Sequence, residues 1–443
     1  MDILEYADKV WRQEASVASY WSGELRKDEL YKVADGVHMW PAAGNVYVFE
    51  TDNGLLMFDA GGADTAMDLF HATRRLSAAP LRHAIYSHGH VDHIWGTTGF
   101  DEEADKLGWN RPTVIAHSAV KARFDRYVYT NGYNTAINRR QFQNPDLEWP
   151  KDYRYPDVTF DDRMALSQGG LSVELSHGYG ETDDAVVGWF PEKKIVCVGD
   201  FFIWMSPNAG NPQKVQRYAR LWAAKLREIA GLGAEILLPG HGLPIVGRDR
   251  IVEAMVTTAE YLEFLHDTTL EYLNSGAPLD SAIHGFSMPA RFLDKPYLQP
   301  KYDEPEFVVR NAWRLYGGWY DGDPSNLKPA KRSALGKAIT ELAGGTDKLA
   351  AKAKEELQRG NDRVAAKLIQ HAVDGNPDDR SLHAVRAEIF GALQEQATST
   401  MSQGVYAWTV SESIARIEGK DTLDLLRQRA RPMGHQHLES PVP

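Results

Sequence analysis

Four residues of the kinds that bind metal ions occur within the seven-residue segment SHGHVDH, at positions 87–93. The segment directly follows the strand-like residues 83–86. In an extended chain His88 and His90 project to the same side, and Asp92 and His93 can turn back from the start of a following helix. A lone histidine is better explained as a core or surface residue, but this spacing after a strand favours metal ligation. The segment predicts a loop that can serve two metal ions.

The rest of the chain alternates short apolar runs with turn residues and helical stretches. Hairpin signals extend over residues 30–60, a helix is expected over 63–78, and short strands are expected up to residue 238. After about residue 250 only helical patterns remain. We therefore expect an α/β catalytic domain over 1–250, a helical domain over 251–400, and a C-terminal helix with a loose tail over 401–443.

The composition limits which binding partners the protein can have and which residue types can be its metal ligands. The 443 residues carry 49 basic and 61 acidic side chains, a formal charge of −12, which argues against nucleic acid and anionic membranes as partners. A single cysteine, Cys197, rules out an internal disulfide and a thiolate metal cage, so the ligands must be His, Asp or Glu. No signal peptide or long apolar run is evident, and we expect a soluble, cytoplasmic protein.

Two further ligand-type residues end other predicted strands. Asp200 ends the run IVCVGD, and His241 ends ILLPGH. Taken alone, Asp200 is better explained as a helix N-cap and His241 as a turn residue. Their occurrence downstream of residues 87–93 reverses that preference and predicts that they join the metal site.

The order of these motifs resembles the metallo-β-lactamase superfamily over residues 31–250. The resemblance implies a four-layer αβ/βα sandwich with a dinuclear metal site between its sheets. Where most members have Gly-His-Thr, this chain has Gly180-Glu181-Thr182, and a glutamate at this place points to the alkylsulfatases. The segment FVVRNAWRLYGGWYDGDPSNLKP, residues 307–329, also resembles the start of the alkylsulfatase dimerisation domain.

The chain departs from typical alkylsulfatases in three respects. Asp200 stands where they usually have glutamate, HGHVDH replaces the more typical HSHADH, and their C-terminal sterol-carrier-like domain is absent. The resemblance to alkylsulfatases is therefore better evidence for the fold and the metal site of this chain than for its substrate.

The resemblance implies that His88, His90 and Glu181 hold one metal ion. Asp92, His93 and His241 would hold the other, and Asp200 would bridge the two. Two divalent ions sharing a water lower its pKa and provide a bridging hydroxide as the nucleophile. Zinc is the expected metal, and the oxygen-rich ligand shell keeps manganese and iron open.

An anionic ester also needs a local cationic contact. Arginine suits a sulfate oxyanion because it makes bidentate hydrogen bonds. Arg217 is the first candidate, Arg139 and Arg140 are others, and Asn208 is a weaker polar one. With Asp92 and Asp200, Arg217 and Asn208 complete the predicted catalytic set. The apolar residues 201–205 can line a pocket for an alkyl group, although core packing explains them at least as well.

We expect a dinuclear metallohydrolase that cleaves a sulfate ester of an alkyl or other apolar alcohol. The same site on a carboxylic ester, lactone, amide or phosphoester is the alternative, and a third hypothesis is a helical interaction protein with a vestigial metal domain. The aromatic segment around Trp313, Tyr316, Trp319 and Tyr320 predicts a homodimer. The opposing interpretation is that these helices pack on the catalytic domain of the same chain.

Overall fold

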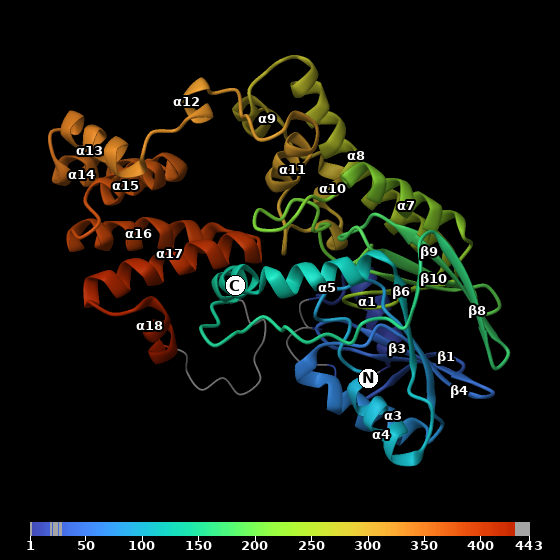
Figure 1. The fold of residues 1–443 in the computed structure, drawn as a ribbon. Helices are drawn as coiled ribbons and strands as arrows, with labels where there is room; N and C mark the ends of the chain where they lie inside the picture. The colour runs from blue at the N-terminus through green and yellow to red at the C-terminus, as the bar shows by residue number, and fades with distance from the viewer. Residues whose placement is uncertain (1, 18–19, 21–24, 26–28, 430–443) are drawn as a thin grey trace.

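The structure is a computed structural model that describes residues 2–17, 20, 25 and 29–429. Residues 31–246 contain two β-sheets that face each other (Figure 1). The seven-stranded sheet follows chain order: β1 (Tyr31–Ala34), β2 (Val37–Trp40), β3 (Val46–Thr51), β4 (Gly54–Phe58), β5 (Leu81–Ile85), β6 (Thr113–His117) and β7 (Val158–Phe160). The six-stranded sheet has the order β13 (Ile245–Val246), β12 (Ile236–Pro239), β11 (Ile195–Gly199), β10 (Ala185–Phe190), β9 (Leu171–Gly178) and β8 (Arg163–Gln168). The predicted loose tail lies outside the described residues.

Strand β3 shows why the sheets stack in layers. Its side chains alternate, so Tyr47 and Phe49 join the core between the two sheets, whereas Val46 and Val48 join a second core behind the first sheet. A strand with both faces apolar can only be stable when both faces are covered. The second core is closed by the helices α3 (Ala66–Leu76), α4 (Thr98–Leu107) and α5 (Ala119–Tyr129).

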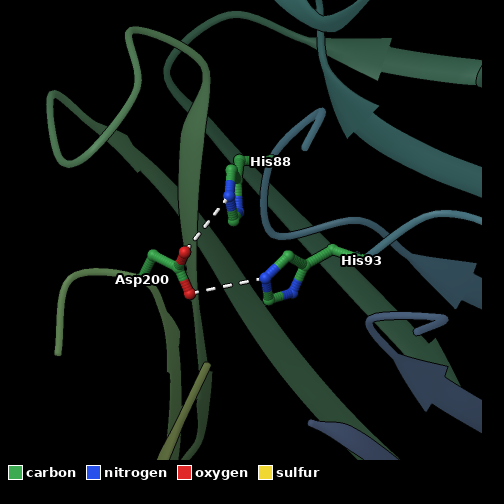
Figure 2. A group of neighbouring side chains, drawn as sticks. All are labelled: His88, His93 and Asp200. Carbon is green, nitrogen blue, oxygen red and sulfur yellow. Dashed lines mark ion pairs between the residues drawn. The ribbon is translucent and has the colours of Figure 1, made fainter. Parts of the chain in front are cut away.

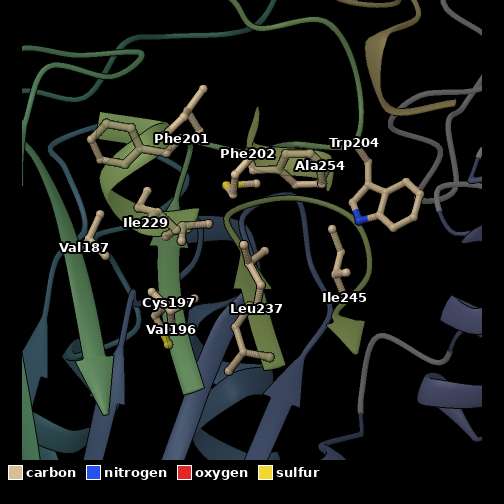
Figure 3. Packing of buried hydrophobic residues seen from close by; sticks show 14 of the residues in the cluster. Val187, Val196, Cys197, Phe201, Phe202, Trp204, Ile229, Leu237, Ile245 and Ala254 are labelled. Carbon is tan, nitrogen blue, oxygen red and sulfur yellow. The ribbon is translucent and has the colours of Figure 1, made fainter. Parts of the chain in front are cut away.

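The far side of the six-stranded sheet is covered by α7 (Ala219–Gly231) and α8 (Arg248–Asn274). Figure 3 shows the apolar packing around β11, where Cys197 lies in register with Gly188, on the face toward the seven-stranded sheet. Cys197 is fully buried and forms no disulfide. Helices, two sheets and helices make the four-layer α/β sandwich that the sequence predicted.

From α8 onward the described chain contains helices and loops. They are α9 (Leu279–Gly285), α10 (Ala290–Leu293), the 3-10 turn η2 (Pro296–Leu298), α11 (Pro305–Gly317), α12 (Pro324–Leu327), α13 (Arg332–Ala343), α14 (Thr346–Gln358), α15 (Asp362–Gly375), α16 (Arg380–Gln396), α17 (Thr400–Glu418) and α18 (Thr422–Arg429). This confirms a helical second region. Because α8 begins before residue 250 and α17 begins at residue 400, the domain boundaries at 250 and 400 remain predictions.

The helical region returns to the catalytic region at α17. This helix packs on α6 (Asn131–Phe142), and Gln143, just after α6, donates a hydrogen bond of 2.9 Å from Nε2 to the carbonyl of Gly404. Figure 1 shows α13–α15 held apart from α11 by an extended segment that carries α12. None of the helices in the described ranges is long and apolar enough to cross a bilayer.

Candidate metal centre

The loop between β5 and α4 carries four of the predicted ligands. We expected Asp92 and His93 at the start of the following helix, but α4 begins only at Thr98 and both residues lie in turns before it. The reason is an anchor that the sequence analysis missed. Asp59, just after β4, accepts a hydrogen bond from the Ser87 amide (2.6 Å) and contacts His93 Nδ1 (3.0 Å).

Asp59 is fully buried and has a φ of 59°, which is uncommon for a residue with a side chain. By fixing Nδ1 of His93, it aims Nε2 of that ring at the centre. The signal that could have identified it is the acidic residue at the end of the apolar run LLMFD, the same pattern that identified Asp200.

Asp200 and His241 enter from the other sheet. They follow β11 and β12, which are parallel neighbours, so the ends of these strands meet at one sheet edge. Gly240 makes this approach possible, because a side chain there would collide with the Asp200 carboxylate. His241 Nε2 lies 3.3 Å from Asp200 Oδ1 and 3.4 Å from Asp92 Oδ2.

A buried network holds the His241 loop against the first sheet. The Asn45 side-chain amide donates to the carbonyls of Pro239 (3.1 Å) and Gly242 (2.9 Å), and Tyr47 Oη donates to the Pro239 carbonyl (2.6 Å). The Asn45 backbone amide also donates to the Gly240 carbonyl. Asn45 was not predicted to take part, because nothing in the neighbouring sequence signals a partner almost two hundred residues away.

Asp200 lies at the middle of the cluster. Figure 2 shows its two carboxylate oxygens directed at different rings: Oδ2 lies 3.5 Å from His88 Nε2, and Oδ1 lies 3.5 Å from His93 Nε2. Glu181 lies in the loop between β9 and β10, and its Oε1 is 3.8 Å from His90 Nδ1. The structure therefore brings all seven predicted ligands together.

The predicted substrate residues Arg217 and Asn208 also lie here, but both contact Glu181. Asn208 Nδ2 donates to Glu181 Oε1 at 2.5 Å, and the Arg217 guanidinium lies 3.2 Å from the same oxygen. Arg217 also donates to the Asn208 carbonyl. All three side chains are buried, so part of the hydrogen-bonding capacity of Arg217 is already used by the protein.

The clustered charges shift one another's pKa. Burial raises the pKa of Asp200, but the imidazoles of His241 and His93 outweigh this and hold it well below its usual value. Burial lowers the pKa of His241, and Asp200 more than compensates, raising it to about 9. Burial raises the pKa of Glu181 against the opposing charge of Arg217. Burial, together with His88 and Arg123, lowers the pKa of His90 well below its usual value.

The donor atoms fit divalent metal ions. His88 Nε2, His93 Nε2 and Asp200 Oδ1 are buried within the described structure, yet none of them has a hydrogen-bond partner. Such atoms are costly to bury unless something binds them. Three sets of ligand atoms lie close enough to hold an ion: His88, His93 and Asp200; Asp92, His93 and His241; and His90, Glu181 and Asp200. Asp200 belongs to two of these sets, as a bridging ligand requires, and so does His93, which the resemblance assigned to one ion only.

Several other residues of the catalytic region do not join the metal centre. Phe201, Phe202 and Trp204 are buried among apolar side chains, so core packing explains them better than a substrate pocket (Figure 3). His117 and His177 stack on each other with ring centroids 3.8 Å apart and belong to none of the three ligand sets. Of the other arginines, Arg139 donates to the Leu147 carbonyl and Arg140 to Gln213 Oε1.

A buried ion pair next to the ligand loop was also missed. Arg123 of α5 contacts Asp183 and, at 2.6 Å, Asp184, and Asp184 accepts a hydrogen bond of 3.3 Å from the Gly89 amide. This pair fixes the backbone between His88 and His90. A single arginine on a predicted helix gives no sign of such a role.

Two family models match this chain in separate regions. A model described as "Metallo-beta-lactamase superfamily" matches residues 39–241, and one described as "Alkyl sulfatase dimerisation" matches residues 279–414. Among curated proteins, the linear primary-alkylsulfatase of Pseudomonas sp. (strain ATCC 19151) is 24% identical over 403 residues, covering 86% of this chain and 76% of the relative. The (R)-specific secondary-alkylsulfatase of Pseudomonas sp. is 25% identical over 391 residues, covering 82% of this chain and 58% of the relative. The alkyl/aryl-sulfatase BDS1 of Saccharomyces cerevisiae is 22% identical over 410 residues, covering 85% and 62%.

Among solved structures, the stereoselective inverting sec-alkylsulfatase Pisa1 from Pseudomonas sp. superimposes with a TM-score of 0.78 at 21% identity. The match covers 89% of this chain and 66% of that structure. This chain thus spans about 60% of the length of several of its relatives. The shared fold extends through both the sandwich and the helical region.

Proposed function

We propose that this chain, a member of the alkylsulfatase-like branch of the metallo-β-lactamase superfamily, is a dinuclear metallohydrolase that cleaves sulfate esters of apolar alcohols. One observation carries the proposal: six His, Asp and Glu side chains from loops of both sheets surround Asp200, and several buried donor atoms among these seven residues have no hydrogen-bond partner in the described structure. The sulfatase relatives supply the substrate class. The sulfatase relatives and the metallo-β-lactamase fold support a hydrolase.

In the proposed site, His88, His90 and Glu181 would hold one ion, and Asp92, His93 and His241 would hold the other. Asp200, whose two oxygens face His88 and His93, would be shared by both. Two divalent ions, zinc first and manganese or iron as alternatives, supply an activated water and polarise the ester. Asp59 keeps His93 in the tautomer that presents Nε2.

The proposed metal centre is open to solvent at three of its ligands. The side chain of Asp92 is 31% exposed and those of His90 and His241 are 18% exposed, whereas His88 and His93 are fully buried. An ester therefore reaches the centre past Asp92, His90 and His241. The buried ligands form the back of the site and exclude water from it.

The activity test compares four classes of substrate. Purified protein loaded with zinc or manganese is given a medium-chain alkyl sulfate, the matching alkyl phosphate, a carboxylic ester and a lactone. We expect sulfate release with the highest kcat/KM, loss of turnover on chelation, and recovery on adding metal. The matched variant Asp200→Asn should be inactive on all four. Hydrolysis of the phosphate, ester or lactone without sulfate release would assign the site to the alternative substrate class.

We also propose a homodimer formed through the helical region. The match to the dimerisation family covers residues 279–414. Tyr316, Trp319 and Tyr320 are exposed by 53%, 69% and 41%, which favours an interface for them. Trp313 was expected in the same interface but is buried in the core of its own chain, where its indole donates to the Tyr320 carbonyl.

A further inference from the structure

The cations around the metal centre differ in what they already bind. Arg123 is paired with Asp183 and Asp184, and Arg217 with Glu181. Lys214 lies in the loop that connects Asn208 to Arg217, and it is the exception. Within the described structure its ammonium makes no ion pair and no hydrogen bond, although the side chain is half-buried.

The position of Lys214 is set by an aromatic ring. Its Nζ lies 5.1 Å from the ring centroid of Trp149, a cation–π contact that uses none of the three N–H donors. Trp149 is held in turn by its backbone amide, which donates to Thr135 Oγ1 (3.0 Å), and by its carbonyl, which accepts from the Asn131 side chain. The ammonium is therefore placed while its donors stay available.

Lys214 also lies within electrostatic reach of the metal centre. Burial lowers its pKa to about 8, the charges of Arg217 and Arg123 act in the same direction, and Glu181 and Asp92 oppose them. Lys214 stands three residues before Arg217, whose guanidinium lies 3.2 Å from the proposed ligand Glu181, so the loop that carries Lys214 borders the site. At neutral pH most of the Lys214 side chains remain charged, since the pH is below this pKa.

We propose that Lys214 is a substrate-binding residue that contacts the anionic group of the ester at the metal centre, a role the sequence assigned to Arg217. The assignment rests on the proposed function, because it presumes an anionic substrate. A buried cation without a carboxylate partner is stabilised when an anion binds next to it. Arg217, whose guanidinium is engaged by Glu181 and Asn208, then serves mainly to position Glu181.

The test uses the metal-loaded, full-length enzyme and three variants. Lys214→Gln removes the charge, Lys214→Arg keeps it, and Lys151→Gln removes an exposed charge from the loop that carries Trp149. Calorimetry measures binding of inorganic sulfate, and steady-state kinetics measure KM and kcat for a medium-chain alkyl sulfate. Metal content and circular dichroism establish that each variant is folded and loaded.

We expect Lys214→Gln to weaken sulfate binding and raise KM by about tenfold or more, with a smaller effect on kcat. Lys214→Arg should recover most of the loss, and Lys151→Gln should match the wild type. Sulfate affinity and KM within twofold of wild type in Lys214→Gln would overturn the proposal, as would a wild type that binds no sulfate. Failure of the proposed function looks different: the wild type binds sulfate through Lys214 but releases none from the ester.

Discussion

His90 is the ligand best suited to a single-residue test, because its side chain is 18% exposed and contributes little to the core. We expect His90→Ala to lower kcat/KM by at least about 100-fold and to reduce the bound metal, since it removes a ligand donor. The melting temperature of the chelated protein should change by only a few degrees. His284→Ala, which removes a more exposed histidine of α9, is the matched control. A fully active His90→Ala enzyme would show that the motif is structural.

The pKa values of the centre predict how metal binding depends on pH. Asp200 raises the pKa of His241 to about 9, and burial raises that of Glu181, so both groups hold protons near pH 7 before a cation binds. Binding must displace these protons, and affinity should therefore rise with pH from 6 to 9. Calorimetric titration with zinc in buffers of different ionisation enthalpy measures the released protons. An affinity independent of pH would contradict these assignments.

At the scale of elements, α5 is joined to the ligand loop through Arg123. Asp184 is fully buried, and burial raises its pKa, but Arg123 more than offsets this and keeps the carboxylate ionised. Arg123→Ala leaves that charge without its partner, so we expect a loss of about 3–5 kcal/mol in the free energy of unfolding at pH 7.

The pH dependence of the Arg123→Ala effect has a definite sign. In the wild type the lowered pKa of Asp184 contributes stability above the ordinary carboxyl pKa, and this contribution disappears as the pH falls through the lowered value. The difference between wild type and variant should therefore shrink in acid. Denaturant unfolding at pH 7 and at a series of pH values below the ordinary carboxyl pKa of 3.8 measures it. Lys121→Ala, at an exposed position on the same helix, should leave stability nearly unchanged.

The elements that could be predicted from sequence are those with apolar patterns. Strands β10 and β11 coincide with short apolar runs, because strands covered on both faces are apolar throughout. Helix α6 was not predicted, since its buried face includes Asn134, Asn138 and Gln141. A polar buried face gives no hydrophobic period. The same contrast holds for the site residues. The proposed ligands stand at the ends of apolar strands, where the sequence pattern reveals them, whereas Asn45 and Arg123 contact residues that are distant in the sequence.

At the scale of the whole molecule, the exposed aromatic segment after α11 predicts self-association. We expect light scattering at micromolar concentration to give about twice the 49.6 kDa of one chain. Trp319→Glu, at a side chain 69% exposed, should shift the protein toward monomer. Tyr129→Glu, at a side chain 74% exposed on α5, should not. A wild-type mass that stays near one chain on concentrating would reject the dimer and leave α11 and α12 as an intramolecular cover.

The arrangement of the ligands on two sheets also bears on how the fold is kept closed. His88 and His241 are more than 150 positions apart in the sequence, and they meet only when the sheets have docked. Ions bound there tie the two ends of a long loop, as a disulfide does in a secreted protein, and a chain with a single cysteine has no such bond of its own. Cations bound at the proposed centre would thus also act as a reversible cross-link. Resistance to heat and to proteolysis should follow the free zinc concentration, so that loss of metal marks a molecule for unfolding as well as for inactivity.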